Sequence, residues 1–219
     1  MSSPDYYASP LDVVDATNAN MFIKDIRQCT GCPLGRQNSA EGGLTCPGWF
    51  PGFGIDLLFV GMSPGEDEAR GKSAGRPFVG KAGHKLMLLA DSVGLFLPID
   101  NQPVHFGLTN IVRCHTPSNR PPTGEEAAAC RRWLDIEIDM ADPLVVCLLG
   151  NSAIELAFPG KKIGEVAGDT RAMGRRIYIA CYHPAAILHR PDPYTEESIK
   201  GSLRLAREFI IAGRRRSDS

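Results

Sequence analysis

The sequence predicts an α/β fold, a three-layer α/β/α sandwich with a central four-stranded parallel sheet. Two observations lead to this prediction. Four apolar runs have the length of buried strands, and each is followed by a segment with helical periodicity. Repeated alternation of strands and helices is typical of a parallel sheet with helices on both faces. Because 219 residues suit one such domain, we expect a single domain over residues 1–219.

The predicted strands are nearly continuous apolar runs, as expected for strands that are buried on both faces of a sheet. They cover Ile55–Val60, Val104–Val112, Leu144–Leu149 and Arg176–Cys181. The helices that follow them are predicted from apolar residues at helical spacing. They cover Ala82–Val93, a segment whose capping box begins at Thr123, Asn151–Phe158, and Thr195–Ala212 with Gly213 at its end.

The remaining segments have weaker patterns. Leu11–Ile26 predicts one further helix. Residues 29–54 are rich in Gly, Pro and Cys and have no clear periodicity, so something other than an apolar stripe must hold them in place. We expect residues 1–8 and 214–219 to be flexible ends.

The composition excludes several classes of protein. Lys and Arg total 24 against 25 Asp and Glu, and this net charge of −1 excludes a generally basic coat for nucleic acids. A hydrophobic fraction of 43% excludes a wholly disordered chain. The longest apolar run is too short to span a bilayer, and the N-terminus carries no secretion signal. The seven cysteines are therefore expected to be thiols or metal ligands in a reducing compartment.

Four of these cysteines could enclose a metal ion or an iron–sulfur cluster. Cys29 and Cys32 form a C-x-x-C pair, Cys114 ends the second predicted strand, and Cys130 lies on the next helix. Such a centre would pin the 29–54 segment to the edge of the sheet. Two alternatives stay open from spacing alone, because Cys130 could be a core residue and Cys46 could be a ligand. Cys147 and Cys181 lie inside strands and are predicted to be core residues.

A glycine-rich loop follows the first predicted strand, at Gly61–Ser73. It is not a phosphate-binding loop, since five residues rather than four separate Gly65 from Gly71 and three acids lie between them. Polar residues also follow the other three strands. Because ligands bind outside the carboxyl ends of parallel strands, we expect these groups to meet at one edge of the sheet. They are Asn110, Asn119, Arg120, Asn151 and His183.

Taken in order along the chain, these motifs resemble the uracil-DNA glycosylase superfamily, most closely its family 4 iron–sulfur enzymes. Each motif alone is a weak signal, but together they are specific, and the resemblance covers the chain from about Cys29 to Phe209. The matching segments are Cys29–Leu34, Gly61–Glu68, Gly75–Gly80, Thr109–Cys114, Asn119–Arg120, Cys130 and His183–Arg190.

The resemblance implies a monofunctional enzyme of base excision repair that hydrolyses the N-glycosidic bond of uracil flipped out of DNA and releases free uracil. It also implies that Cys46 is not a ligand and that a 4Fe–4S cluster is held by Cys29, Cys32, Cys114 and Cys130. Family members of this type are bacterial or archaeal, so we expect a cytoplasmic monomer without membrane contact. No lysine stands out as the nucleophile that lyase activity would need.

Individual roles follow from the same resemblance. Phe78 resembles the platform on which uracil stacks, Asn110 the group that reads the edge of the base, and His183 the donor to uracil O2. Gly61, Met62, Ser63 and Asn119 are expected to line the same substrate site. Ile187 or Leu188 would fill the stack that the flipped base leaves, and Arg190 and Arg120 would contact DNA.

One position departs from the family pattern. Family 4 enzymes usually carry Glu where this chain has Met62, and methionine can neither activate water nor stabilise a cation by charge. Glu68 is a second acid of the motif, and we predict that it activates water or stabilises the sugar cation. The departure leaves an alternative open, a uracil- or abasic-site-binding protein with little turnover. A metal-bearing nucleotide-binding protein unrelated to repair is a third hypothesis.

Overall fold

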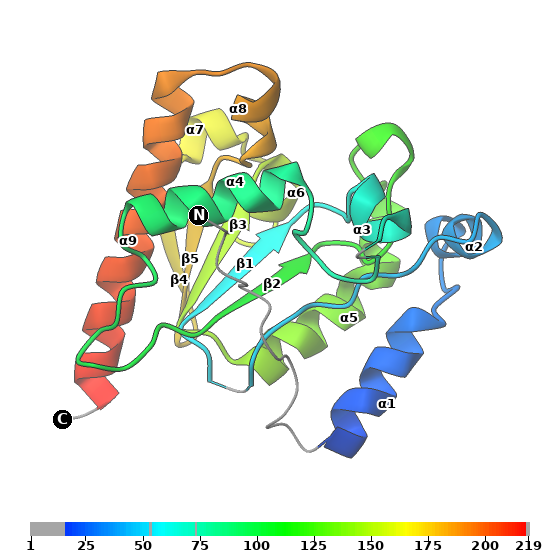
Figure 1. Cartoon of the computed structure of the whole chain (residues 1–219), viewed down its shortest axis with the longest axis horizontal. Coiled ribbons are helices and arrows are strands. Elements are labelled where there is room, and N and C mark those ends of the chain that lie inside the picture. Colours follow the sequence, from blue (N-terminus) through cyan, green and yellow to red (C-terminus); the bar gives the residue numbers. More distant parts are fainter. Residues whose placement is uncertain (1–15, 53, 73, 218–219) are drawn as a thin grey trace.

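The computed structural model describes residues 16–52, 54–72 and 74–217, and a sheet with helices on both faces organises them (Figure 1). The sheet has five strands in the order β2-β1-β3-β5-β4. Four are parallel, as predicted: β1 (Leu57–Gly61), β2 (Phe106–Asn110), β3 (Val145–Leu149) and β5 (Arg176–Cys181).

The prediction of a purely four-stranded sheet was wrong, because β4 (Thr170–Met173) adds an antiparallel strand at one edge. All four residues of β4 are exposed, so its sequence has no apolar run that could signal a buried strand. It joins β5 through a turn in which Gly174 takes a positive φ of 61°. A short polar hairpin strand of this kind is invisible to hydrophobic patterning.

The strands alternate their side chains between two apolar layers. Leu58 and Val60 face α5 (Gly124–Ala141), while Leu57 and Phe59 face the opposite layer of helices. That second layer is formed by α4 (Lys81–Ser92) and α9 (Pro193–Ser217), which lie together across the sheet in Figure 1. The short helices α6 (Asn151–Ile154) and α7 (Ile163–Val166) pack on the α5 side. Cys147 and Cys181 are fully buried, as predicted.

The chain before the sheet is more helical than expected. Helix α1 (Ala16–Arg27) covers the described part of the predicted 11–26 helix, of which residues 11–15 lie outside the described residues. The 29–54 segment contains α2 (Pro33–Ala40), which hydrophobic periodicity did not predict. Proline at the first helical position and the Cys32 sulfur, which accepts the Gly35 N–H, begin this helix. Two further short elements lie near the sheet edge, α3 (Glu66–Arg70) and the 3₁₀ turn η1 (Pro117–Asn119).

The last helix runs to Ser217 and does not stop at Gly213, so residues 214–217 of the predicted flexible end are helical. Arg214 explains the extension. Its Nε and Nη2 atoms donate to the Asp56 carboxylate at 2.8 and 2.6 Å, and it also bonds the Pro103 carbonyl at 2.6 Å. A bidentate, charge-assisted contact of this kind holds the last turns of α9 against the chain before β1 and β2. Residues 1–8 and 218–219 lie outside the described residues, among which no helix is long and apolar enough to cross a membrane.

Candidate active site

The carboxyl ends of the four parallel strands meet at one edge of the sheet. Gly61 at the end of β1 pairs in register with Asn110 at the end of β2, and Leu149 of β3 pairs with Cys181 of β5. His183 follows two residues later. Three strand spacings of ~4.8 Å separate β2 from β5, so the two polar residues stand on strands roughly 14 Å apart. The chain leaves β1 for β2 on one side and β3 lies on the other, and such a switch point is where open α/β sheets bind ligands.

Asn110 presents a buried hydrogen-bond donor that has no partner within the part of the chain that the structure describes. Its side chain is 3% exposed, and its Nδ2 atom makes no hydrogen bond. An unsatisfied buried donor costs about 1–3 kcal/mol. A ligand with an acceptor at this position would recover that cost.

Gly61 brings the Asn110 amide and the Phe78 ring together. A Cβ atom added at Gly61 would lie 2.4 Å from Asn110 Oδ1 and 2.8 Å from Phe78 Cζ. Both distances are too short for any side chain, so only glycine lets these two groups meet at the end of β1. The Phe78 ring and the Asn110 amide oxygen therefore both lie against Gly61.

The Phe78 backbone is held in an unfavourable conformation. Its φ is +61°, in the left-handed region that costs a non-glycine residue about 1–2 kcal/mol. Two contacts hold it there. The Glu68 carboxylate accepts the Phe78 N–H, and Gly83 of α4 lies so close that a Cβ would overlap the Phe78 carbonyl. The surrounding structure thus fixes the backbone of Phe78, the residue predicted to be the base platform.

Glu68 clasps the glycine-rich loop to the Phe78 turn. Its carboxylate accepts the N–H of Gly65 at 3.0 Å and that of Gly80 at 3.5 Å, besides that of Phe78. The side chain is 8% exposed. Burial raises the pKa of Glu68 above its usual value, against the lowering effect of these N–H donors. A carboxylate offers about four lone-pair sites, so one acceptor site is left beyond the three in use.

His183 is held as a neutral donor. The Ala185 N–H donates to His183 Nδ1 at 3.1 Å, so the proton of the neutral ring is on Nε2. Burial lowers the pKa of His183 to about 4, because the charged imidazolium would lose its hydration. Gly150, at a φ of +82°, leaves room for the ring, since a Cβ there would lie 3.2 Å from His183 Cβ.

The segment after His183 forms helix α8 (Ala185–His189) beside α4 and α9. Of the two predicted wedge residues, Ile187 is buried at 6% exposure and Leu188 is exposed at 40%. Only Leu188 is thus placed to reach a partner outside the molecule. Arg190 follows and is exposed.

The loop after β2 carries Asn119 and Arg120. Asn119 is exposed and has a positive φ of 55°, as does its neighbour Ser118 at 54°. Arg120 forms a bidentate pair with Glu126 of α5 at 2.8 and 2.7 Å, and this contact lowers the pKa of Glu126 to about 2. The positive charge of Arg120 is therefore already partly neutralised by Glu126.

Met62 and Ser63 lie between β1 and α3 and are partly buried. Ser63 Oγ lies 3.0 Å from Thr116 Oγ1, and the Met62 carbonyl accepts the Val112 N–H. These bonds tie the glycine-rich loop to the loop after β2. Met62 itself brings no charge to the site.

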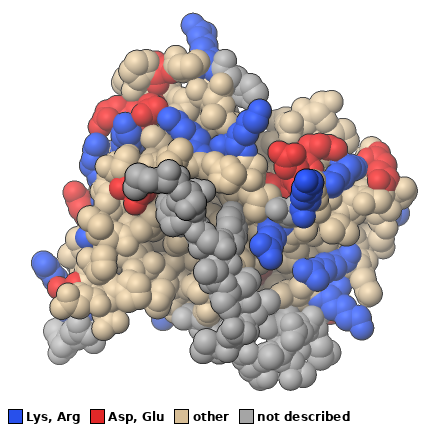
Figure 2. Space-filling model, in the orientation of Figure 1, with Lys and Arg blue, Asp and Glu red and all other residues tan. Residues whose placement is uncertain are grey.

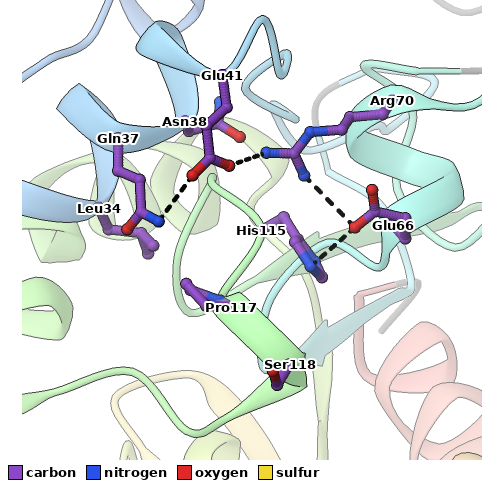
Figure 3. Close-up of a pocket in the computed structure, with 9 residues that line it drawn as sticks. All are labelled: Leu34, Gln37, Asn38, Glu41, Glu66, Arg70, His115, Pro117 and Ser118. Carbon is purple, nitrogen blue, oxygen red and sulfur yellow. Dashed lines mark hydrogen bonds and ion pairs between the residues drawn. The ribbon is translucent and has the colours of Figure 1, made fainter.

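A separate polar cavity of about 340 Å³ lies between α2, α3 and η1 (Figure 3). A chain of polar contacts crosses it. Arg70 forms ion pairs with Glu41 at 2.5 Å and with Glu66 at 3.4 Å, and the Glu66 carboxylate lies 3.1 Å from His115 Nε2. His115 Nδ1 also bonds the Pro64 carbonyl at 2.9 Å. Because these groups bond one another, they connect three segments around the glycine-rich loop.

The four predicted ligand cysteines come together from the α1–α2 junction, the loop after β2, and α5. Burial raises the pKa of Cys114 to about 12, and the neighbouring Cys130, Cys32 and Cys29 sulfurs add to this rise. Burial alone would also raise the pKa of Cys29, but hydrogen bonds from the Gly31 N–H and Trp133 bring it below its usual value.

These cysteines fit an iron–sulfur cluster by their chemistry. The Trp133 indole N–H donates to the Cys29 sulfur at 3.4 Å, and the Gly35 N–H donates to the Cys32 sulfur at 3.3 Å. Donors of this type stabilise thiolate ligands and tune clusters. Among the described residues, no three His, Cys, Asp or Glu side chains are arranged as the ligands of one metal ion.

A buried ion pair between Arg113 and Glu137 was missed in the sequence. Both side chains are 1% exposed, and Glu137 Oε2 lies 2.5 Å from Arg113 Nη2. One signal could have shown it, because Glu137 shares the apolar face of α5 with Leu134 and Ile138. A carboxylate at such a position needs a buried partner.

The fold and this edge define a class of protein: an α/β protein whose sheet edge carries the Phe78 ring, the Asn110 amide and the neutral His183 imidazole. Comparison with known proteins names the family, since the uracil DNA glycosylase superfamily matches residues 47–204. The chain belongs to this superfamily. It is 33% identical over 192 residues to the type-4 uracil-DNA glycosylase of Thermotoga maritima. The matched region covers 84% of this chain and 91% of that protein.

Two further relatives agree with this assignment. The type-4 uracil-DNA glycosylase of Archaeoglobus fulgidus is 33% identical over 183 residues, covering 78% of this chain and 83% of its own length. The type-5 uracil-DNA glycosylase of Thermus thermophilus is 34% identical over 192 residues, covering 74% and 84%. The chain is thus related to the type-4 enzymes over most of its length.

The state of His183 gives a first testable prediction. Followed by NMR, its ring should titrate near pH 4 and carry its proton on Nε2 at pH 6. Because the folded pKa lies below the ordinary value of about 6.5, stability should fall as the pH drops from 6.5 towards 4, where only the unfolded chain takes up the proton. The urea-unfolded protein is the control. A folded-state midpoint near 6.5, or a proton on Nδ1, would contradict the assignment.

Proposed function

We propose that the protein is a monofunctional DNA glycosylase that hydrolyses the N-glycosidic bond of uracil flipped out of DNA and releases uracil for base excision repair. The observation that supports this proposal is the buried Asn110 amide. Its Nδ2 donor has no partner among the described residues, and its Oδ1 lies against Gly61, as does the Phe78 ring. A base must leave the duplex before its glycosidic bond can be attacked, and a buried site of this kind receives the flipped base.

Asn110 supplies selectivity for uracil. Its Nδ2 can donate to uracil O4 while its Oδ1 accepts from uracil N3–H. Cytosine has the opposite polarity at both positions, so the same amide would leave buried groups unpaired at about 1–3 kcal/mol each. Stacking of the base on Phe78 adds about 1–3 kcal/mol to the binding free energy, whichever base is bound.

His183 stabilises the leaving group. As the C1′–N1 bond breaks, its electron pair passes to the uracil ring, and negative charge gathers at O2. The neutral His183 donates a hydrogen bond from Nε2 to this oxygen and keeps its proton. A water molecule adds to C1′ and gives up one proton to solvent, and the departing uracil anion takes up one proton from solvent, which leaves a sugar hydroxyl and free uracil. A preorganised donor of this type typically contributes 100-fold or more to the rate.

Other residues at the edge hold DNA around the extruded nucleotide. Leu188 is exposed and fills the emptied position in the stack, with the buried Ile187 supporting it. Arg190 and Arg120 contact phosphates, and Gly61, Met62, Ser63 and Asn119 line the base and sugar. On the face seen in Figure 2, the described basic side chains lie in small separate groups among acidic and uncharged surface, so local contacts rather than a broad basic surface hold the DNA.

Strand cleavage of oligonucleotides tests the proposed function. Single- and double-stranded DNA with one uracil should break after incubation with the protein and alkali. His183→Ala should lower kcat/KM by about 100-fold or more, because the O2 donor is lost. Phe78→Ala should lower it by about 10-fold through lost stacking. His84→Ala, on the exposed face of α4, is the matched control and should leave the rate unchanged.

The same experiment separates the alternative function. Met62 brings no charge to the site, and this favours a uracil- or abasic-site-binding protein as the second candidate. Retention of uracil-containing or abasic DNA without strand breaks would support that candidate. A protein that neither cleaves nor retains such DNA would contradict both.

Glu68 is the acid that we assign to water activation or stabilisation of the sugar cation. Its buried carboxylate has a raised pKa and one acceptor site beyond its three N–H donors. Glu68→Gln should therefore lower kcat by about 100-fold, and Met62→Glu should raise it by adding a second carboxylate. Asp67→Asn removes a charge from the same turn and is the control. If Glu68→Gln is as active as Asp67→Asn, Glu68 has only its clasp role.

The four cysteines hold a 4Fe–4S cluster in this proposal. Such a cluster would tie the 29–54 segment to the loop after β2 and to α5, and its role is structural. Protein purified without oxygen should be brown and contain iron and sulfide. Cys114→Ser should lose the iron, whereas Cys46→Ser, at a buried cysteine nearby, should keep it. Equal loss in both variants, or a colourless zinc-loaded protein, would overturn the ligand set.

A further inference from the structure

We propose that the buried Glu137–Arg113 ion pair, together with Thr109, positions Asn110 for base recognition. None of these three residues is among the groups assigned to the base, so they act through Asn110. The proposal rests on the proposed function, because it concerns the residue that reads uracil.

The Glu137 carboxylate collects four hydrogen bonds. Oε1 accepts the Gly48 N–H at 2.7 Å and Arg113 Nε at 3.0 Å. Oε2 accepts Thr109 Oγ1 and Arg113 Nη2, both at 2.5 Å. With both oxygens fully used and 1% exposure, this side chain has a single defined position. A Cβ at Gly48 would lie 2.8 Å from Oε2, so the backbone of the 29–54 segment packs directly against the carboxylate.

The network holds Asn110 from both directions along the chain. Thr109, the residue before it, is fixed through its hydroxyl to Glu137. Arg113, three residues after it, donates from Nη1 to the Asn110 backbone carbonyl. The backbone of the reading residue is therefore tied twice to one carboxylate on α5.

This support matters because the Asn110 side chain has little support of its own. Its Nδ2 makes no hydrogen bond within the described chain, and Oδ1 lies against Gly61. Because Nδ2 makes no hydrogen bond within the described chain, no such bond at this atom selects one orientation of the amide, and turning it over would exchange donor and acceptor against uracil O4 and N3–H. The position and direction of the Asn110 Cα–Cβ bond, which the backbone sets, must therefore limit this freedom.

Thr109→Val tests the inference with the smallest change. Valine keeps the shape of threonine and removes only the hydroxyl that donates to Glu137. We expect kcat/KM on uracil DNA and the affinity for free uracil to fall by about 10-fold, since small displacements of positioning groups have effects of this order or larger. Thr109→Ser restores the hydroxyl and should restore both values. Thr170→Val, on the exposed strand β4, is the control for the Thr-to-Val change itself.

Glu137→Gln is the stronger variant, because an amide nitrogen cannot accept from Arg113. We expect a loss of about 100-fold in kcat/KM, and Glu125→Gln on the exposed start of the same helix is its control. If Glu137→Gln fails to fold, the Thr109 series still decides the question.

The Asn110 side-chain N–H signals in NMR spectra give a readout independent of activity. Wild type and both controls should show one sharp pair, and Thr109→Val should show broadened or doubled signals. Unchanged signals and unchanged uracil affinity in Thr109→Val would overturn the positioning role. If the wild type neither cleaves uracil DNA nor binds uracil, the proposed function fails, while these signals still test whether Thr109 and Glu137 order Asn110.

Discussion

Parallel pairing of β2, β1, β3 and β5 is the constraint on which the rest of the structure depends. It brings the carboxyl ends of all four strands to one edge, between two apolar layers. Polar groups that follow the strands are therefore partly removed from water. This desolvation has two consequences for chemistry at the site. The buried Asn110 donor has neither water nor a partner among the described residues, and the pKa of His183 falls far enough to keep its ring neutral.

The segments without hydrophobic periodicity are attached to this edge by polar clasps. Glu68 accepts three backbone N–H groups and holds the Phe78 turn. Glu137 accepts the Gly48 N–H and the Thr109 hydroxyl, and so joins the 29–54 segment to the end of β2. Each is a buried carboxylate that accepts three or four hydrogen bonds, and these bonds offset much of its cost of burial. Ordered loops at the site thus depend on specific hydrogen bonds, whereas the sheet depends on its apolar core.

Hydrophobic patterning was sufficient for the sheet and its main helices but not for elements held by other forces. It predicted the four parallel strands and α4 and α5, and it led us to expect Asn110 and His183 at one edge, where the register has them. It missed β4, which is wholly exposed, and the last turn of α9, which Arg214 holds through Asp56. The Arg113–Glu137 pair joins residues 24 positions apart, and the sequence signals only one half of it, a carboxylate on the apolar face of α5. The left-handed Phe78 depends on tertiary contacts with Glu68 and Gly83, which hydrophobic patterning does not encode.

The central claim is that Asn110, Phe78 and His183 surround one extruded uracil. A crystal structure with duplex DNA whose single uracil nucleotide resists cleavage of its glycosidic bond tests this claim most directly. We predict the uracil ring against Phe78, O4 within hydrogen-bond distance of Asn110 Nδ2, and O2 within that distance of His183 Nε2. A base that stays in the duplex, or that is bound away from these three side chains, would contradict the account.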